Sequence, residues 1–276
     1  MTDPAQTASP ARPVVVVLGS GRSGTSLLMQ VLAALGLRVS PDLIEARRDN
    51  PRGFFEDARI VRIQADLMRA LGAWPYHALP PDWLEAPATD VAARALRQVL
   101  RENLDRDGLW GFKDPRTAPF LPLWQRLFAE ESLEPRYILA LRAPGSILRS
   151  FMAAYRTPLE TAEAVWLRRT CDALRHTRAA CHIVHYEDWF TRGAEVASGL
   201  ARYTGLAGNA DDLPDELVRP DLNRAGGGER LLGDPAARAL DAALAGCRGD
   251  GFDRNSLLAA VAASCPDREP VDSPPS

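Results

Sequence analysis

Residues 13–36 have the sequence PVVVVLGSGRSGTSLLMQVLAALG, and this stretch decides the fold. The run Val14 to Leu18 is apolar and mostly β-branched, which is typical of a strand buried on both faces of a parallel sheet. A glycine-rich turn follows, and leucines recur at helical spacing from Thr25 until Gly36. The N-terminus of a helix presents unpaired backbone N–H groups and the positive end of the helix dipole. The turn therefore predicts a phosphate-binding site.

The loop departs from the nucleoside-triphosphatase pattern at one position. Gly19 and Gly24 have the spacing of G-x-x-x-x-G-K-[ST], but Thr25 stands where that pattern has the lysine that reaches the β- and γ-phosphates. A cation lies instead inside the loop, at Arg22. The bound phosphate is therefore expected to belong to a different kind of donor.

A second motif follows the predicted strand 137–141. Arg142 ends this strand, and Pro144 and Ser150 come two and eight residues later. A triphosphatase is expected to place an aspartate here to hold magnesium. A guanidinium and a hydroxyl suit a second anionic group instead.

Together the two motifs resemble those of sulfotransferases that use 3′-phosphoadenosine-5′-phosphosulfate (PAPS) as donor and release 3′-phosphoadenosine-5′-phosphate (PAP). The resemblance implies that Arg142 and Ser150 contact the 3′-phosphate. It implies that Tyr186 lies near the adenine and that Arg224, beside a run of three glycines, is a late phosphate ligand. It also implies that the 5′-phosphosulfate lies on the loop residues Gly21, Arg22, Ser23, Gly24, Thr25 and Ser26. Two of these assignments have an alternative. Tyr186 could be a buried tyrosine at the end of a strand, and the run of three glycines could be a linker.

Some positions differ from the cytosolic aryl and steroid sulfotransferases. Those enzymes have a lysine where Arg22 stands and an adenine-stacking tryptophan where Leu27 stands. Their Lys-Thr-His catalytic segment is replaced by Lys113-Asp114-Pro115. The resemblance is therefore closer to the broad bacterial and carbohydrate-type branch, and it covers most of residues 13–190.

The general base is expected to be a carboxylate. Glu56 is the first candidate, because the segment 52–56 resembles an acidic segment that follows the first helix in bacterial members of the family. An equally weighted alternative is that Glu56 and Asp57 cap the next helix. Asp114 is the second candidate, and a structural pairing with Lys113 or Arg116 is favoured over catalysis for it.

Two cations are expected to stabilise the charge that develops during transfer. Lys113 and Arg22 both follow apolar strands that are predicted to be parallel. Both would then emerge at the carboxyl edge of the sheet, where such folds bind ligands.

The alternation of strands and helices predicts an α/β protein, a three-layer P-loop-like fold with a central parallel sheet flanked by helices. We expect a sulfotransferase domain over 13–265, after a flexible lead (1–12) and before a disordered tail (266–276). Within it lie an aromatic insertion at about 72–90 and a mobile loop at about 208–233. The aromatic insertion is either a lid or acceptor wall, or a local hydrophobic cluster.

Composition limits the remaining possibilities. A net charge of −3 gives no basis for nucleic-acid binding, and no apolar run is long enough to span a membrane. The N-terminal residues lack the apolar core of a secretory signal, so we expect a cytoplasmic enzyme whose four cysteines are reduced. The expected acceptor is a hydroxyl of a small molecule or carbohydrate, with no metal; the oligomeric state stays open. The alternatives are a magnesium-dependent small-molecule kinase and a non-catalytic nucleotide-binding protein.

Overall fold

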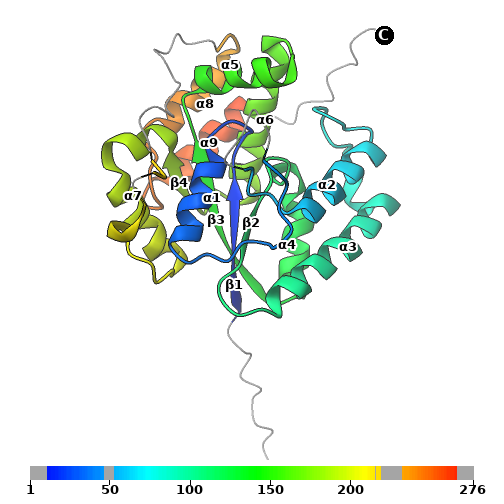
Figure 1. The fold of residues 1–276 in the computed structure, drawn as a ribbon. Helices are drawn as coiled ribbons and strands as arrows, with labels where there is room; N and C mark the ends of the chain where they lie inside the picture. Colours follow the sequence, from blue (N-terminus) through cyan, green and yellow to red (C-terminus); the bar gives the residue numbers. More distant parts are fainter. Residues whose placement is uncertain (1–10, 47–52, 215, 219–231, 266–276) are drawn as a thin grey trace, which may run out of the picture.

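The computed structural model describes residues 11–46, 53–214, 216–218 and 232–265. Within them a parallel sheet of four strands has the order β2-β1-β3-β4 (Figure 1). The strands are β1 (Arg12–Leu18), β2 (Gly111–Lys113), β3 (Leu133–Leu141) and β4 (Cys181–His185). β1 is central, pairing with β2 on one side and β3 on the other. The predicted α/β class with a parallel sheet is confirmed.

Alternate residues of β1 enter two separate hydrophobic cores. Val15 and Val17 pack against α1 (Thr25–Ala34) and α7 (Trp189–Thr204) on one face of the sheet. The remaining valines and Leu18 pack on the other face. The helices on that face are α2 (Ala58–Ala70), α3 (Pro87–Leu104), α4 (Leu121–Glu130), α5 (Pro144–Tyr155), α6 (Leu159–His176), α8 (Pro235–Leu244) and α9 (Arg254–Ser264). β1 is thus buried on both faces, as its unbroken apolar sequence predicts.

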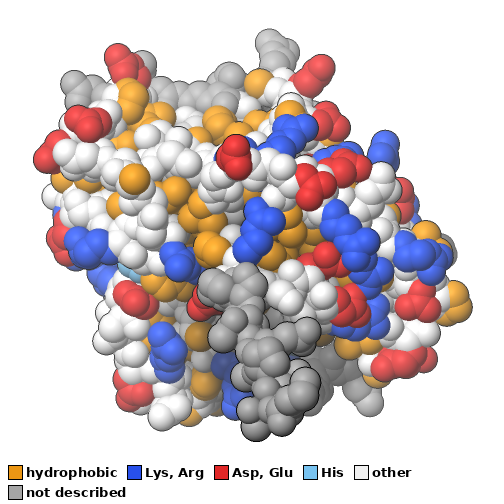
Figure 2. All heavy atoms as spheres, turned by 90° about the horizontal axis from the view of Figure 1, so that it is seen from below, with side chains coloured by type: hydrophobic (Ala, Val, Ile, Leu, Met, Phe, Trp, Pro, Cys, Tyr) orange, Lys and Arg blue, Asp and Glu red, His pale blue; other side chains and the backbone are white. Residues whose placement is uncertain are grey.

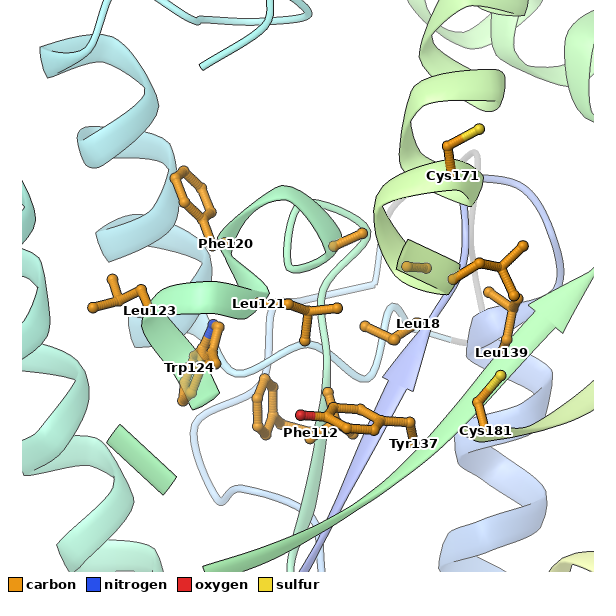
Figure 3. Packing of buried hydrophobic residues seen from close by; sticks show 14 of the residues in the cluster. Leu18, Phe112, Phe120, Leu121, Leu123, Trp124, Tyr137, Leu139, Cys171 and Cys181 are labelled. Atoms are coloured by element: carbon orange, nitrogen blue, oxygen red, sulfur yellow. The ribbon is translucent and has the colours of Figure 1, made fainter. Parts of the chain in front are cut away.

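Aromatic packing anchors the short strand β2. The ring of Phe112 lies 4.5 Å from that of Trp124 on α4 and 5.3 Å from that of Trp110. Figure 3 shows Phe112, Trp124 and Tyr137 gathered between the strands and α4. These contacts fix the backbone that carries Lys113, the last residue of β2.

A disulfide joins Cys171 on α6 to Cys265, directly after α9. The prediction of four reduced cysteines is therefore wrong for this pair, although Cys181 and Cys247 are free and buried. α6 and α9 pack in the same core and bring the two Cα atoms to 6.5 Å, within the range of a disulfide. Their separation of 94 positions in the sequence gave no sign of this proximity. Since persistent disulfides are rare in reducing compartments, this bond runs counter to the expected cytoplasmic location.

The aromatic segment before α3 contains a buried cluster and also lines a cavity. Trp83 is buried with its ring 5.5 Å from that of Phe120, as in a local hydrophobic cluster. Trp74 is 39% exposed, and Tyr76 is half-buried beside a cavity that α6 also lines. α3 begins at Pro87, slightly before the predicted end of the insertion.

Several predicted features lie wholly or largely outside the described residues. These are the flexible lead, the disordered tail, much of the loop at 208–233, and Arg224 within that loop. Arg12, the last residue of the predicted lead, already belongs to β1.

The face where the strands begin mixes both signs of charge. Figure 2 shows acidic and basic side chains interspersed over it, in keeping with the small net charge of −3. The predicted site lies at the opposite edge, where the strands end. In the described part of the chain, every helix is too short or too polar to cross a membrane.

Candidate active site

The glycine-rich loop connects β1 to α1 through residues with positive φ angles. Gly19 has φ 147° and Gly24 has φ 88°, and a Cβ on Gly24 would lie 2.4 Å from Cδ2 of Tyr186. The turn is closed by Ser23, whose Oγ donates to the carbonyl of Ser20 at 2.7 Å. Gly24 is the N-cap of α1, and within the described chain no side chain caps that helix end. The loop therefore leaves the backbone N–H groups of α1 available for an anion.

A hydrogen bond links the loop to the second motif. Arg22 Nε donates to Ser150 Oγ at 2.8 Å, although the two residues are 128 positions apart. Arg142 Nη1 donates to the carbonyl of Arg22 at 3.3 Å. The structure thus brings both arginines and the serine to one place at the carboxyl edge of the sheet.

Arg142 stacks on the aromatic residue that follows β4. Its guanidinium carbon lies 4.3 Å from the ring centroid of Tyr186, which is 7% exposed. Burial lowers the pKa of the Arg142 guanidinium. Its Nε is buried and has no hydrogen-bond partner among the described residues. A buried N–H without a partner is costly, so this donor suits an anionic ligand.

A buried ion pair lies beside the start of α1. Lys113 Nζ is 2.6 Å from Glu56 Oε1 and 3.5 Å from Ser26 Oγ. The Lys113 side chain is 3% exposed, so a solvated surface charge is excluded for it. Arg116 Nη2 approaches the other oxygen of Glu56 at 3.3 Å. Lys113 is therefore adjacent to the residue Ser26 at the start of α1, and Glu56 is paired with Lys113.

The helix-capping alternative holds for Asp57 and fails for Glu56. The Asp57 side chain accepts hydrogen bonds from the backbone N–H groups of Arg59 and Ile60 at the start of α2. The Glu56 side chain turns away from this helix toward Lys113 and Arg116.

Asp114 belongs to a buried polar network behind the site. Its carboxylate accepts from Gln64 Nε2 at 2.7 Å, from Arg116 Nε at 2.7 Å and from the backbone N–H of Arg116 at 3.0 Å. Gln64 in turn accepts from Trp124 Nε1 at 3.0 Å. The predicted pairing with Arg116 is confirmed, and a pairing with Lys113 does not appear among the hydrogen bonds and ion pairs of the described residues. Because Asp114 is 1% exposed and its carboxylate accepts hydrogen bonds from three donor groups, it is poorly placed to take a proton from an acceptor.

One residue near the loop was not predicted as part of the site. Arg169 lies on α6, and its Nη1 is 3.8 Å from the position of a Cβ built on Gly21. A sequence signal for it existed, because Arg169, Asp172 and His176 follow Val165 at helical spacing, and all four line one cavity.

One family model matches most of the sequence. The sequence model described as "Sulfotransferase family" matches residues 13–211, which is well over half of the chain. No curated protein matches the sequence closely enough to count as a relative.

Three solved structures are similar to the chain. The sulfotransferase domain from the Synechococcus PCC 7002 olefin synthase is 20% identical, with 96% of this chain and 92% of that chain covered and a TM-score of 0.45. The sulfotransferase domain from the curacin biosynthetic pathway is 18% identical, with 83% of each chain covered and a TM-score of 0.47. A sulfotransferase from Alicyclobacillus acidocaldarius is 16% identical, with 77% of this chain and 89% of that chain covered and a TM-score of 0.43. On the match of the family model over residues 13–211, this chain belongs to the sulfotransferase family.

Proposed function

We propose that the chain transfers a sulfuryl group from PAPS to a hydroxyl of a small-molecule or carbohydrate acceptor by in-line displacement. The observation that carries this proposal is the junction of Arg22, Arg142 and Ser150, which joins two motifs that each suit one anionic end of this donor. A nucleoside triphosphate has no 3′-phosphate for the second motif to hold.

The donor would bind across the carboxyl edge of the sheet. The loop 21–26 and the uncapped start of α1 suit the 5′-phosphosulfate. The buried Nε of Arg142 and the Ser150 hydroxyl suit the 3′-phosphate, and Arg22 lies between the two anions. The Tyr186 ring, held between Gly24 and Arg142, suits the adenine. Arg224 stays part of the proposal as a late phosphate ligand.

The reaction needs one base and cations for the leaving phosphate. When bound, PAPS supplies the activated sulfuryl group, whose bond to the 5′-phosphate breaks as the acceptor oxygen bonds to sulfur. Glu56 takes the proton of the acceptor hydroxyl, because it lies beside the loop whereas Asp114 is enclosed by hydrogen-bond donors. Lys113, next to Ser26, and Arg22 stabilise the charge that grows on the leaving phosphate. Asp114 holds Arg116 in position against Glu56.

The decisive experiment is a binding titration with PAP, compared with ADP and with ATP in the presence and absence of magnesium. We expect binding of PAP that is indifferent to magnesium. Arg142→Ala should weaken it about tenfold to 100-fold, because a charged hydrogen bond is worth about 1.5–3 kcal/mol. Arg94→Ala, an exposed arginine on α3, is the matched control and should bind PAP like the parent.

Two results would contradict the proposal. Binding of ATP only with magnesium would favour the kinase alternative. Binding of PAP with equal affinity by the parent and Arg142→Ala would remove the second motif from the donor site.

A further inference from the structure

We propose that the cavity between α6 and the segment 75–83 is the acceptor site, and that it takes an alcohol with an apolar body rather than a carbohydrate. Arg169, at the junction of this cavity with the donor loop, would face the sulfuryl group as it is transferred. This inference rests on the proposed function and narrows its acceptor class.

The cavity has the size and walls of a small-molecule site. Its volume is about 410 Å³, within the usual range for ligand pockets. Pro75, Leu79 and Trp83 line one wall, and Ala164 and Val165 of α6 line another. These side chains carry no hydrogen-bonding group except the indole N–H of Trp83. Polar side chains, among them Tyr76, His77, Asp172 and His176, line other parts of the cavity. Against the apolar wall itself, a sugar would lose its hydrogen bonds to water without replacement, whereas an aliphatic or aromatic body would gain from burial.

Arg169 connects this cavity to the donor loop. It lines the cavity, and its Nη1 lies 3.8 Å from the position of a Cβ on Gly21. It also lies within electrostatic range of Arg116 and Asp114, whose network continues to Glu56. A hydroxyl held beside Arg169 would therefore lie at the end of the cavity that is next to the donor loop.

The charge of Arg169 is not balanced by a bonded partner. Among the described residues its guanidinium takes part in no hydrogen bond and no ion pair. Burial, followed by the nearby charge of Arg116, lowers the pKa of Arg169. A guanidinium removed from water in this way is stabilised by an anion, and Gly21 places the anionic end of the donor next to it.

The transfer moves the anionic sulfuryl group from the donor to the acceptor in the cavity. The acceptor oxygen forms a bond to sulfur, the bond from sulfur to the 5′-phosphate oxygen breaks, and the hydroxyl proton passes to Glu56. The product is a sulfate monoester whose apolar body fills the cavity and whose charge faces Arg169. An apolar sulfate ester is therefore a direct probe of the site.

The test measures binding of 2-naphthyl sulfate by calorimetry in the presence of saturating PAP. We expect the parent to bind it more tightly than methyl glucoside 6-sulfate. Arg169→Gln should weaken binding of 2-naphthyl sulfate about tenfold to 100-fold, the range for a charged hydrogen bond, with PAP binding nearly unchanged. Ala164→Trp places a large side chain in the cavity while Arg169 stays unsubstituted, and it should abolish binding of 2-naphthyl sulfate. Arg94→Gln is the matched control and should bind both ligands like the parent.

Each contrary result has a distinct meaning. Parent-like binding of 2-naphthyl sulfate by Ala164→Trp would overturn the cavity as the site, and parent-like binding by Arg169→Gln would overturn the role of Arg169. Tighter binding of the sugar sulfate would overturn the apolar class. If the parent fails to bind PAP, the proposed function fails, and the cavity is still tested by comparing the parent with Ala164→Trp without PAP. If Arg169→Gln does not fold, Ala164→Trp still tests whether the cavity is the acceptor site.

Discussion

A methyl group added to Gly24 should damage both the fold and the donor site. Gly24 has φ 88°, and a Cβ there would lie 2.4 Å from Cδ2 of Tyr186. The Tyr186 ring cannot move freely, because the Arg142 guanidinium stacks on it at 4.3 Å. Gly24→Ala therefore combines an unfavourable backbone angle with a collision between a methyl group and an aromatic ring.

The helix that begins after Gly24 contains its own control. Gly36, just beyond the other end of α1, has φ 102°, and a Cβ there would meet no atom within 4 Å. The backbone cost of alanine at a left-handed angle is about 1–2 kcal/mol at either position. The lower entropy of the unfolded alanine chain is also common to both and cancels in the comparison. The collision adds about 1–3 kcal/mol at Gly24 alone, so its total cost is about 2–5 kcal/mol.

Urea unfolding and PAP titration of both variants test this reasoning. Gly36→Ala should lose about 1–2 kcal/mol of unfolding free energy and bind PAP like the parent. Gly24→Ala should lose more and bind PAP at least about tenfold more weakly, since stacking of a base on an aromatic ring is worth about 1–3 kcal/mol. Tyr186→Ala should reduce the extra loss of stability in the double variant, because the two residues are in contact. Equal stability and equal PAP affinity for the two glycine variants would refute the argument.

Three further outcomes are expected. Glu56→Gln should lower kcat about 10²- to 10⁴-fold while PAP binding persists. Asp114→Asn should chiefly lower the unfolding free energy. The opposite pattern would make Asp114 the base and Glu56 the structural residue. Alkylation of the unfolded, unreduced protein should modify two cysteines, and four modified cysteines would contradict the disulfide. Replacing both Cys171 and Cys265 by serine should lower the unfolding free energy, measured in urea, by about 2–5 kcal/mol. Burial raises the pKa of Asp172 from 3.8 to about 6. The unfolding free energy of the parent should therefore fall by up to about 3 kcal/mol relative to that of Asp172→Asn as the pH rises from about 4 to about 6, and the difference should stay constant at higher pH. A difference in unfolding free energy that does not change with pH would count against the burial of this carboxyl.

The sequence was sufficient for the architecture because the signals were local. An apolar β-branched run, a glycine turn and a leucine stripe are each contained within residues 13–36, and each formed the predicted element. The strand-end position of Lys113 followed in the same way from its own neighbours. The hydrogen bond between Arg22 and Ser150 was not predicted: the resemblance only implied that both residues contact one donor, and no local pattern joins residues 128 positions apart.

Contacts between helices that are distant in the sequence were not predicted. The pairing of Cys171 with Cys265 depends on how α6 and α9 pack, and the spacing of the cysteines carries no trace of it. Gln64 has no special sequence context, yet its amide joins Asp114 to Trp124 in the core. The proposal of Glu56 over Asp114 as the base likewise rests on side-chain directions that the tertiary structure supplies.

The Cys171–Cys265 bond divides the chain into mechanically different parts. When the two ends of the molecule are pulled apart in an optical trap, the 94 residue steps between the cysteines cannot extend until the bond is reduced. At about 3.5 Å per residue, the oxidised chain should stop roughly 330 Å short of the length that the reduced chain reaches. The strands β1 to β3 and the glycine-rich loop lie outside this closed ring, whereas β4, α7, α8 and α9 lie inside it. Tension would therefore unravel the part before Cys171 completely, while the part from Cys171 to Cys265 keeps a covalent loop around which to refold.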